Sequence, residues 1–354
     1  MTGNCDISEN LQAAVRAAIA ERAPFCIVGG GTKQFYGRPG QGKPLDVSGN
    51  CGVVAYEPTE LVITARGGTP LVKLETILAE KDQMLPFEPP HFGRQATLGG
   101  TIACGFSGPR RPYAGAARDF VLGVKCLTGK GEILTFGGQV MKNVAGYDVS
   151  RLMVGALGTL GILLEISIKV LPKPAHDITL ALEQNDTGAI TTMNAWGSRP
   201  LPISAACFDG VRLYARLSGT EQGVMATYQK LGGELVKDGY DFWQSIREHR
   251  HPFFNDDTPL WRLSVAPATP KLELPGRWLL DWGGAQRWLK SDAPAAAIRR
   301  AVEAVGGHAT LFRGGDRRDV FHPLAAPLMA LHRNLKTAFD PHGILNPKRM
   351  YDAW

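Results

Sequence analysis

The chain has 354 residues, of which 44% are hydrophobic and 20% are charged, and its formal net charge is +6. This length fits two domains, and the composition is that of a folded protein and not of a disordered one. The basic residues are scattered and lack the aromatic-interleaved stripe of a nucleic-acid-binding protein, so the positive balance favours an anionic small molecule as ligand.

The first half of the chain predicts short strands joined by turns, with few helices. Helical spacing of apolar residues predicts a helix over 8–22, and an apolar run predicts a strand over 25–28 that leads into a glycine triplet. A second helix is expected over 70–81. Further strands are predicted over 53–56, 61–65, 120–127, 132–136 and 161–171.

A linker is predicted at Leu171-Pro172-Lys173-Pro174, because two prolines so close together continue neither a strand ladder nor a helix. We therefore place a first domain over 1–173 and a second over 174–354. The second half predicts strands over 178–183, 203–208, 211–217, 260–265, 277–282 and 308–313, and helices over 220–231, 241–250, 294–304 and 323–338. Interleaved strands and helices of this kind indicate an α+β fold.

The sequence also bears on the cellular compartment. The most apolar stretch, 152–171, contains Glu165 and Lys169, so we expect a buried strand pair there and not a membrane span. Acidic residues occur where the apolar part of a secretion signal would lie. The six cysteines form no C-x-x-C pair, which argues against a zinc site or an iron–sulfur cluster made by this chain alone and suits a reducing compartment. A cytoplasmic protein is expected.

The first motif is the segment Gly29-Gly30-Gly31-Thr32-Lys33, directly after the predicted strand. Unblocked backbone N–H groups in such a turn can hold a diphosphate. The Rossmann fingerprint is not met, because its sixth position is Gln34, and no P-loop string occurs. Taken alone, the segment is equally well explained as a plain tight turn.

The second motif covers residues 97–108, where small side chains recur. Glycine weakens a strand, so a strand-like run this rich in glycine indicates backbone that lies against a ligand. A close-packed turn region is the alternative.

A third Gly-rich turn over 155–162 again leads into a strand-like run. The three segments together indicate one extended ligand with a diphosphate and a planar ring.

The order of these motifs resembles a known family. It runs from Gly-Gly-Gly-Thr through Pro89-Pro90, Thr-Leu-Gly-Gly-x-x-Ala, Arg118-Asp119 and Gly-x-x-Gly-x-x-Gly-Ile to the segment 339–347. The chain resembles FAD-linked oxidases with a PCMH-type (vanillyl-alcohol-oxidase-like) FAD-binding domain, and among them the FAD-binding subunits of bacterial glycolate oxidases. The resemblance extends over nearly the whole chain. Segments that look typical of those subunits are 84–91, 108–112, 140–148 and 306–310.

The resemblance implies a PCMH-type FAD-binding domain followed by a smaller α+β cap domain, with a C-terminal tail that returns to the first domain. It implies that backbone at 29–33 holds the pyrophosphate of FAD and that Asn346 reaches toward the flavin. The full set of implied cofactor-binding residues is Gly29, Gly30, Gly31, Thr32, Lys33, Pro90, Thr97, Gly99, Gly100, Ala103, Gly108, Gly158, Gly161, Ile162 and Asn346. Thr97 to Ala103 would line the flavin and ribityl chain, and Gly158 to Ile162 the adenine end.

The same resemblance bears on how FAD is attached. Covalent members of this fold link the flavin through a histidine near the first Gly-rich loop, and no histidine precedes His91 here. We therefore expect non-covalent FAD. Cys104 is a candidate for a thioether link, but a buried structural thiol is the better interpretation.

The implied activity is oxidation of glycolate to glyoxylate, with electrons passed through the flavin to a sister FAD-linked subunit and an iron–sulfur subunit. Relatives that oxidise 2-hydroxy acids carry a His-rich metal site in the substrate domain, and we find no equivalent and predict no metal. Hydride transfer needs a base and a cation for the carboxylate. No residue is singled out as the base, and the candidate cations are Arg110, Arg111, Arg118 and Arg313.

Three roles stay open. The flavin of this chain could relay electrons or play a structural part while the sister subunit does the chemistry. The chain could instead be a self-sufficient FAD-dependent oxidoreductase for another small acid, or a flavin-free scaffold. The partner subunits would also decide whether the chain is free in the cytoplasm or held at the inner membrane.

Overall fold

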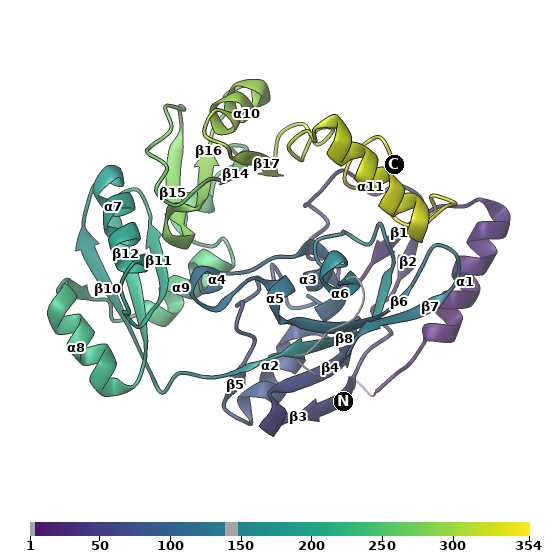
Figure 1. Ribbon diagram of the computed structural model, residues 1–354, viewed down its shortest axis with the longest axis horizontal. Coiled ribbons are helices and arrows are strands. Elements are labelled where there is room, and N and C mark those ends of the chain that lie inside the picture. The colour runs from purple at the N-terminus through teal and green to yellow at the C-terminus, as the bar shows by residue number, and fades with distance from the viewer. Residues whose placement is uncertain (1–3, 139–147) are drawn as a thin grey trace. The chain divides into compact units, whose positions relative to one another are not determined.

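A computed structural model describes residues 4–138 and 148–354 of the chain (Figure 1). Most of the segment 140–148 therefore lies outside the described residues. The chain divides into two compact units, and each is discontinuous in sequence. The first contains Met1–Phe106, Ala116–Pro172 and Pro323–Trp354, and the second contains Ser107–Gly115 and Lys173–His322.

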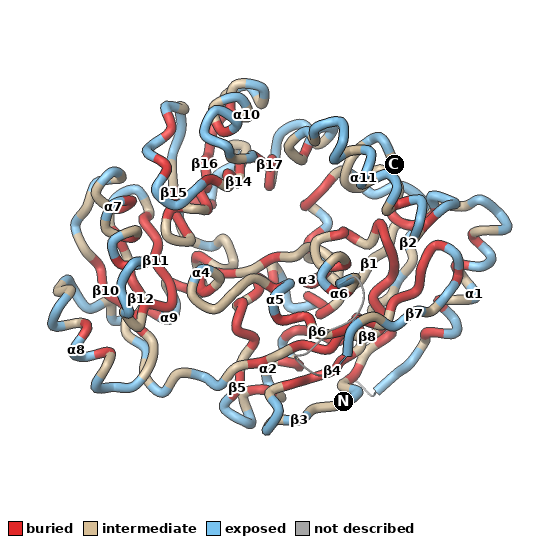
Figure 2. The backbone as a smooth tube through the Cα atoms, viewed as in Figure 1, coloured by how far each residue is buried: buried red, intermediate tan, exposed pale blue. Residues whose placement is uncertain are grey.

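The first unit is built on a five-stranded antiparallel sheet of order β3-β4-β8-β6-β7. Its strands are β3 (Val53–Glu57), β4 (Val62–Arg66), β6 (Val121–Leu127), β7 (Ile133–Gly137) and β8 (Ile162–Lys169). The central strand β8 is mostly buried, as Figure 2 shows. The prediction of a strand pair over 152–171 is wrong, because the glycines at 155, 158 and 161 form a turn there and only one long strand follows it.

Helix α1 (Ser8–Glu21) packs its apolar stripe against this sheet. Leu11, Val15 and Ala18 form one buried cluster with residues of β6 and β8. Beside it lies a parallel pair of strands, β1 (Phe25–Val28) and β2 (Lys43–Asp46). The unit also contains α2 (Leu71–Ala79), β5 (Gln83–Met84), α3 (Leu98–Cys104), α5 (Ala117–Phe120), α6 (Val149–Leu152), β9 (Leu171–Pro172), α11 (Ala326–Phe339) and a 3-10 turn over Pro58–Glu60.

The C-terminal tail is part of the first unit and extends the parallel pair. Phe25 donates its N–H to the carbonyl of Ile344 (2.7 Å) and accepts from the N–H of Asn346 (3.0 Å). At the end of α11, Lys336 Nζ lies 2.5 Å from Asp340 Oδ2 and donates to the carbonyls of Thr159 (2.8 Å) and Leu345 (2.7 Å). Asp340 in turn accepts from the N–H groups of Ile344 and Leu345. A buried ion pair therefore holds the tail where it meets β1.

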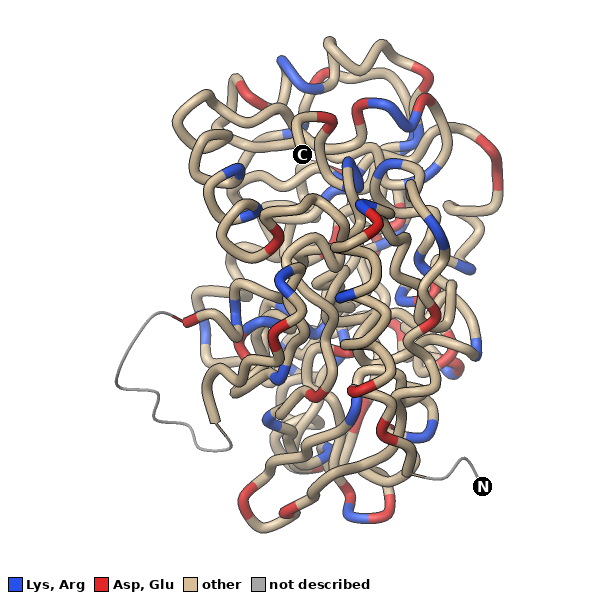
Figure 3. Tube along the Cα trace, turned by 90° about the vertical axis from the view of Figure 1, so that its right-hand side faces the viewer, with Lys and Arg blue, Asp and Glu red and all other residues tan. Residues whose placement is uncertain are grey.

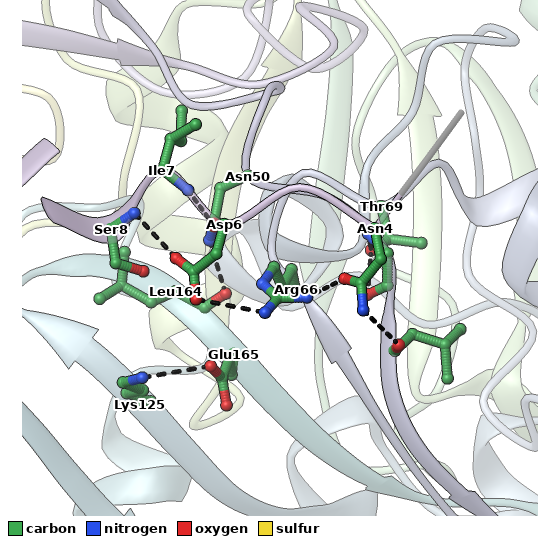
Figure 4. Close-up of polar contacts among 12 residues, drawn as sticks. Asn4, Asp6, Ile7, Ser8, Asn50, Arg66, Thr69, Lys125, Leu164 and Glu165 are labelled. Carbon is green, nitrogen blue, oxygen red and sulfur yellow. Dashed lines mark hydrogen bonds and ion pairs between the residues drawn. The ribbon is translucent and has the colours of Figure 1, made fainter. Parts of the chain in front are cut away.

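The N-terminal arm is fastened to the sheet by a network of polar contacts (Figure 4). The Asp6 carboxylate accepts from the N–H of Ser8 (2.9 Å) and from Arg66 at the end of β4 (3.2 Å). The hydrogen bonds from Ser8, and then the contact with Arg66, lower the pKa of Asp6 to about 2. The buried Asn50 donates to the carbonyl of Leu164 in β8 (2.8 Å). The network thus holds the end of β4, directly before Gly67, and the part of β8 directly after Leu163, and these two residues line the pocket described below.

The second unit is an eight-stranded antiparallel sheet of order β13-β10-β12-β11-β15-β16-β14-β17 with helices packed on it (Figure 1). Its strands are β10 (His176–Glu183), β11 (Ile203–Phe208), β12 (Arg212–Gly219), β13 (Glu234–Leu235), β14 (Leu260–Ser264), β15 (Arg277–Asp281), β16 (Gln286–Lys290) and β17 (His308–Arg313). Its helices are α4 (Arg111–Ala114), α7 (Asp186–Gly197), α8 (Glu221–Leu231), α9 (Gly239–Arg247) and α10 (Ala295–Glu303), with 3-10 turns over Pro252–Phe254 and Trp282–Gly284. The sequence pattern predicts neither α7 nor β16.

Charged residues of both signs are interspersed over the units, as Figure 3 shows. Within the described residues, no helix has the length and apolar character needed to cross a membrane.

Candidate functional site

A recess of the first unit has an empty volume of about 900 Å³, counting the part open to solvent. Its walls come from β1 and the turn after it, from α3, from the turn before β8 and from the C-terminal tail. The lining residues are Ile27 to Gln34, Val47, Gly67, Thr97, Gly99, Gly100, Ala103, Cys104, Met153, Ala156, Leu157, Gly158, Gly161, Ile162, Leu163, Asn346 and Arg349. Three Gly-rich segments that are far apart in sequence therefore meet at one pocket.

The turn after β1 presents backbone donors to this pocket. The N–H groups of Gly30, Gly31 and Thr32 donate to no acceptor within the described part of the chain. Backbone N–H groups are rarely left without an acceptor, and successive ones in a turn form a concave anion site. Gly31 has a φ of +71° and no atom within 4 Å of the place where a Cβ would lie, so this residue faces open space.

The second Gly-rich segment forms a helix and not the strand-like run that the sequence suggested. Thr97 caps α3 by accepting from the N–H of Gly100 (3.2 Å). Gly99 donates to the carbonyl of Gly67 (2.7 Å), and a Cβ on Gly99 would lie 2.9 Å from that oxygen. Here the small residues permit close approach of two backbones as well as access to the pocket.

One side chain, that of Asn346, joins the third Gly-rich segment to the C-terminal tail. Asn346 accepts from the N–H of Ile27 in β1 (2.7 Å) and donates to the carbonyl of Leu157 (2.7 Å). It is buried, and a Cβ on Gly158 would lie 2.8 Å from its amide nitrogen. Asn346 therefore fixes the first and third Gly-rich segments relative to each other.

The charge of the pocket wall is positive. Lys33, which is buried, and Arg349 are its charged residues, and none of the described lining residues is Asp or Glu. The rest of the wall is mainly apolar side chains and glycine backbone. Such a site suits a ligand with an apolar ring system and an anionic group, which fits FAD.

Two of the residues implied by the family resemblance lie elsewhere. Pro90 is buried outside the pocket wall. Gly108 belongs to the second unit, where its carbonyl accepts from Trp282 Nε1 (3.0 Å). Lining residues that the sequence analysis did not select are Ile27, Val28, Gln34, Val47, Gly67, Cys104, Met153, Ala156, Leu157, Leu163 and Arg349, although Cys104 was considered as a point of attachment.

The four candidate arginines differ in their surroundings. Arg111 lies 4.3 Å from the ring centroid of Trp282, and Arg118 is exposed, 3.9 Å from Asp119. Arg110 is buried. Burial lowers the pKa of Arg313. None of the four lines the pocket of the first unit.

Two histidines of the second unit have pKa values lowered by burial. The ring of His249 stacks on Phe254 with 4.1 Å between centroids, and burial holds its pKa well below the usual value. Burial also lowers the pKa of His308. Across residues 4–138 and 148–354, no three His, Cys, Asp or Glu side chains gather as a metal site would require.

Comparisons with known proteins find a FAD-binding domain in the first part of the chain. Residues 5–137 match the model of a FAD binding domain family. The glycolate oxidase subunit GlcD of Bacillus subtilis (strain 168) is 34% identical over 160 residues, covering 44% of this chain and 34% of GlcD. A solved alkyldihydroxyacetonephosphate synthase shares the fold, with a TM-score of 0.65 and 16% identity over 96% of this chain and 74% of the synthase. The glycolate oxidase subunit GlcE of Escherichia coli (strain K12) is 51% identical over 351 residues, 99% of each chain. The chain therefore belongs to the family of glycolate oxidase subunit GlcE, with a PCMH-type FAD-binding domain.

Proposed function

We propose that this pocket holds FAD without a covalent bond. The observation that carries the proposal is the set of unused N–H groups at Gly30, Gly31 and Thr32, in a wall with two cations and no described carboxylate. These donors and Lys33 would hold the diphosphate, while α3 and the apolar wall would lie along the flavin. When bound, FAD supplies a two-electron acceptor.

Non-covalent attachment is supported by the side chains of the wall. None of the described lining residues is a histidine. His91, the first histidine of the chain, lies outside the wall and contacts Glu75 (3.1 Å). Cys104 lines the pocket at the end of α3 and is the residue through which a thioether would form.

We further propose that the chain is the FAD-binding subunit of a complex that oxidises glycolate to glyoxylate. Support comes from its 51% sequence identity to GlcE over 99% of the chain and from the match to GlcD over 44% of the chain. The partners would be a sister FAD-linked subunit and an iron–sulfur subunit. Since none of the described lining residues is His, Asp or Glu, this flavin would pass electrons on while the sister subunit binds and oxidises the hydroxy acid.

The proposal predicts that the purified chain, loaded with FAD, does not turn over glycolate with an artificial electron acceptor. Mixing it with the two partner subunits is expected to restore turnover. Glyoxylate formation is the measurement, with the two partners alone as the control. Turnover of glycolate by the single chain would contradict the division of labour and favour a self-sufficient enzyme.

A further inference from the structure

Arg349 belongs to the pocket wall although it lies 316 positions after Lys33 (349 − 33), the other cation there. Its guanidinium donates to the carbonyls of Gln34 (3.0 Å), Tyr36 (2.7 Å) and Arg38. These carbonyls follow directly on the donor turn. The side chain is therefore held against the stretch that begins at the proposed diphosphate cradle.

These contacts leave the charge of Arg349 without a carboxylate. All three acceptors are neutral carbonyls, and among the described residues no ion pair of Arg349 occurs. Asp352 in the same tail is engaged by Arg38 (2.9 Å) and Lys348 (3.3 Å) instead. Burial lowers the pKa of Arg349, but an arginine stays charged at neutral pH.

The guanidinium also keeps donors for a ligand. It has five N–H groups, and three hydrogen bonds to carbonyls leave two for another acceptor. A half-buried cation such as Arg349 gains from an anion that offsets its desolvation. The arrangement of donors suits the oxygens of a phosphate.

We propose that Arg349 recognises the diphosphate of the bound flavin nucleotide, so that the C-terminal tail supplies one side of the anion site. The inference rests on the proposed binding of FAD in this pocket. Arg349 would then make a charge contact with the ligand in addition to its hydrogen bonds to the carbonyls of residues 34–38.

A purely structural role is the competing explanation, and two ligands together with a lysine variant separate it from charge recognition. FAD carries the diphosphate, and riboflavin lacks it. Loss of the charge contact and distortion of the neighbouring diphosphate turn both weaken FAD more than riboflavin, but only the first is relieved by a lysine at position 349, which restores the charge without the hydrogen bonds to three carbonyls. The measurement is the dissociation constant of each ligand for the full-length apoprotein, by quenching of flavin fluorescence.

Arg349→Gln is expected to weaken FAD about tenfold or more and to leave riboflavin within about twofold. Arg349→Lys keeps the charge and should retain more FAD affinity than the glutamine variant. Arg333→Gln, on the exposed side of α11, is the matched control and should bind both ligands like the wild type.

Equal weakening of FAD and riboflavin in Arg349→Gln, or no weakening of either, would overturn the proposal. FAD affinity of Arg349→Lys as low as that of Arg349→Gln would also overturn it. If the glutamine variant does not fold, the lysine variant decides, because a structural role predicts that it too loses FAD affinity about tenfold or more. Failure of the wild-type chain to bind FAD at all would instead overturn the proposed function.

Discussion

Replacing Asp340 by Asn is expected to lower the free energy of unfolding by about 3–5 kcal/mol, because it leaves Lys336 buried without its counter-ion. Lys336 and Asp340 are 5% and 2% exposed, and their side chains are 2.5 Å apart. The carboxylate also accepts from the N–H groups of Ile344 and Leu345 (3.1 and 2.8 Å). Chemical denaturation of the wild type and the variant measures the difference.

The control for this prediction is Asp148→Asn in the same unit. Asp148 is exposed and caps α6 by accepting from the N–H of Arg151 (3.1 Å), a bond that Asn can also make. Its variant should unfold like the wild type. Equal stability of the Asp340 variant and this control would show that the ion pair does not hold the tail.

Gly30→Ala is expected to reduce FAD affinity by on the order of 100-fold, because it must displace the donor turn. A Cβ at this position would lie 1.5 Å from the carbonyl oxygen of Gln95 and 2.4 Å from its carbon. Both atoms are backbone, so no side-chain rotation relieves the clash. Fluorescence titration of the apoprotein with FAD measures the loss.

Gly197→Ala provides the comparison for this glycine. Gly197 ends α7 in the second unit, and no atom lies within 4 Å of the added Cβ. This variant should keep wild-type affinity for FAD. Wild-type affinity in Gly30→Ala as well would mean that the turn after β1 does not hold the ligand.

Sequence reasoning could locate the parts of the pocket whose backbone conformation depends only on neighbouring residues. Glycine clusters after a strand mark turns with open N–H groups, and such turns need no distant contact to be recognised. The segment 29–33 is of this kind, whereas the turn over 155–162 borders the same pocket with most of its N–H groups already hydrogen-bonded. Asn346 was selected only through the family resemblance.

Long-range contacts were not predictable in the same way. The sequence alone does not distinguish Arg349 from other arginines, because its contacts with residues 34–38 form only when the tail folds back. The glycine-rich character of 97–108 suggested a strand-like run, but Thr97 caps a short helix there. Pro90 and Gly108 were chosen for their place in the motif order, and that order carries no information on which side chains face a pocket.

In two elements of the second unit, β16 and α7, the apolar periodicity of the sequence does not predict the observed structure. Strand β16 contains Arg287 and Lys290, both buried, which breaks the apolar alternation of a strand. Arg287 is accommodated by donating to backbone carbonyls, including that of Pro270 (2.7 Å). Helix α7 is rich in Thr and Gly, residues of low helix propensity, and depends on its cap at Asn185 and on tertiary packing.

The most direct test of the account is an absorption spectrum of the purified chain before and after acid precipitation. Non-covalent FAD in this pocket predicts flavin absorbance in the native protein and its release into the supernatant. Absorbance that stays with the precipitate would contradict non-covalent binding and point to Cys104. A colourless protein that takes up no added FAD would contradict flavin binding itself and favour a scaffold subunit.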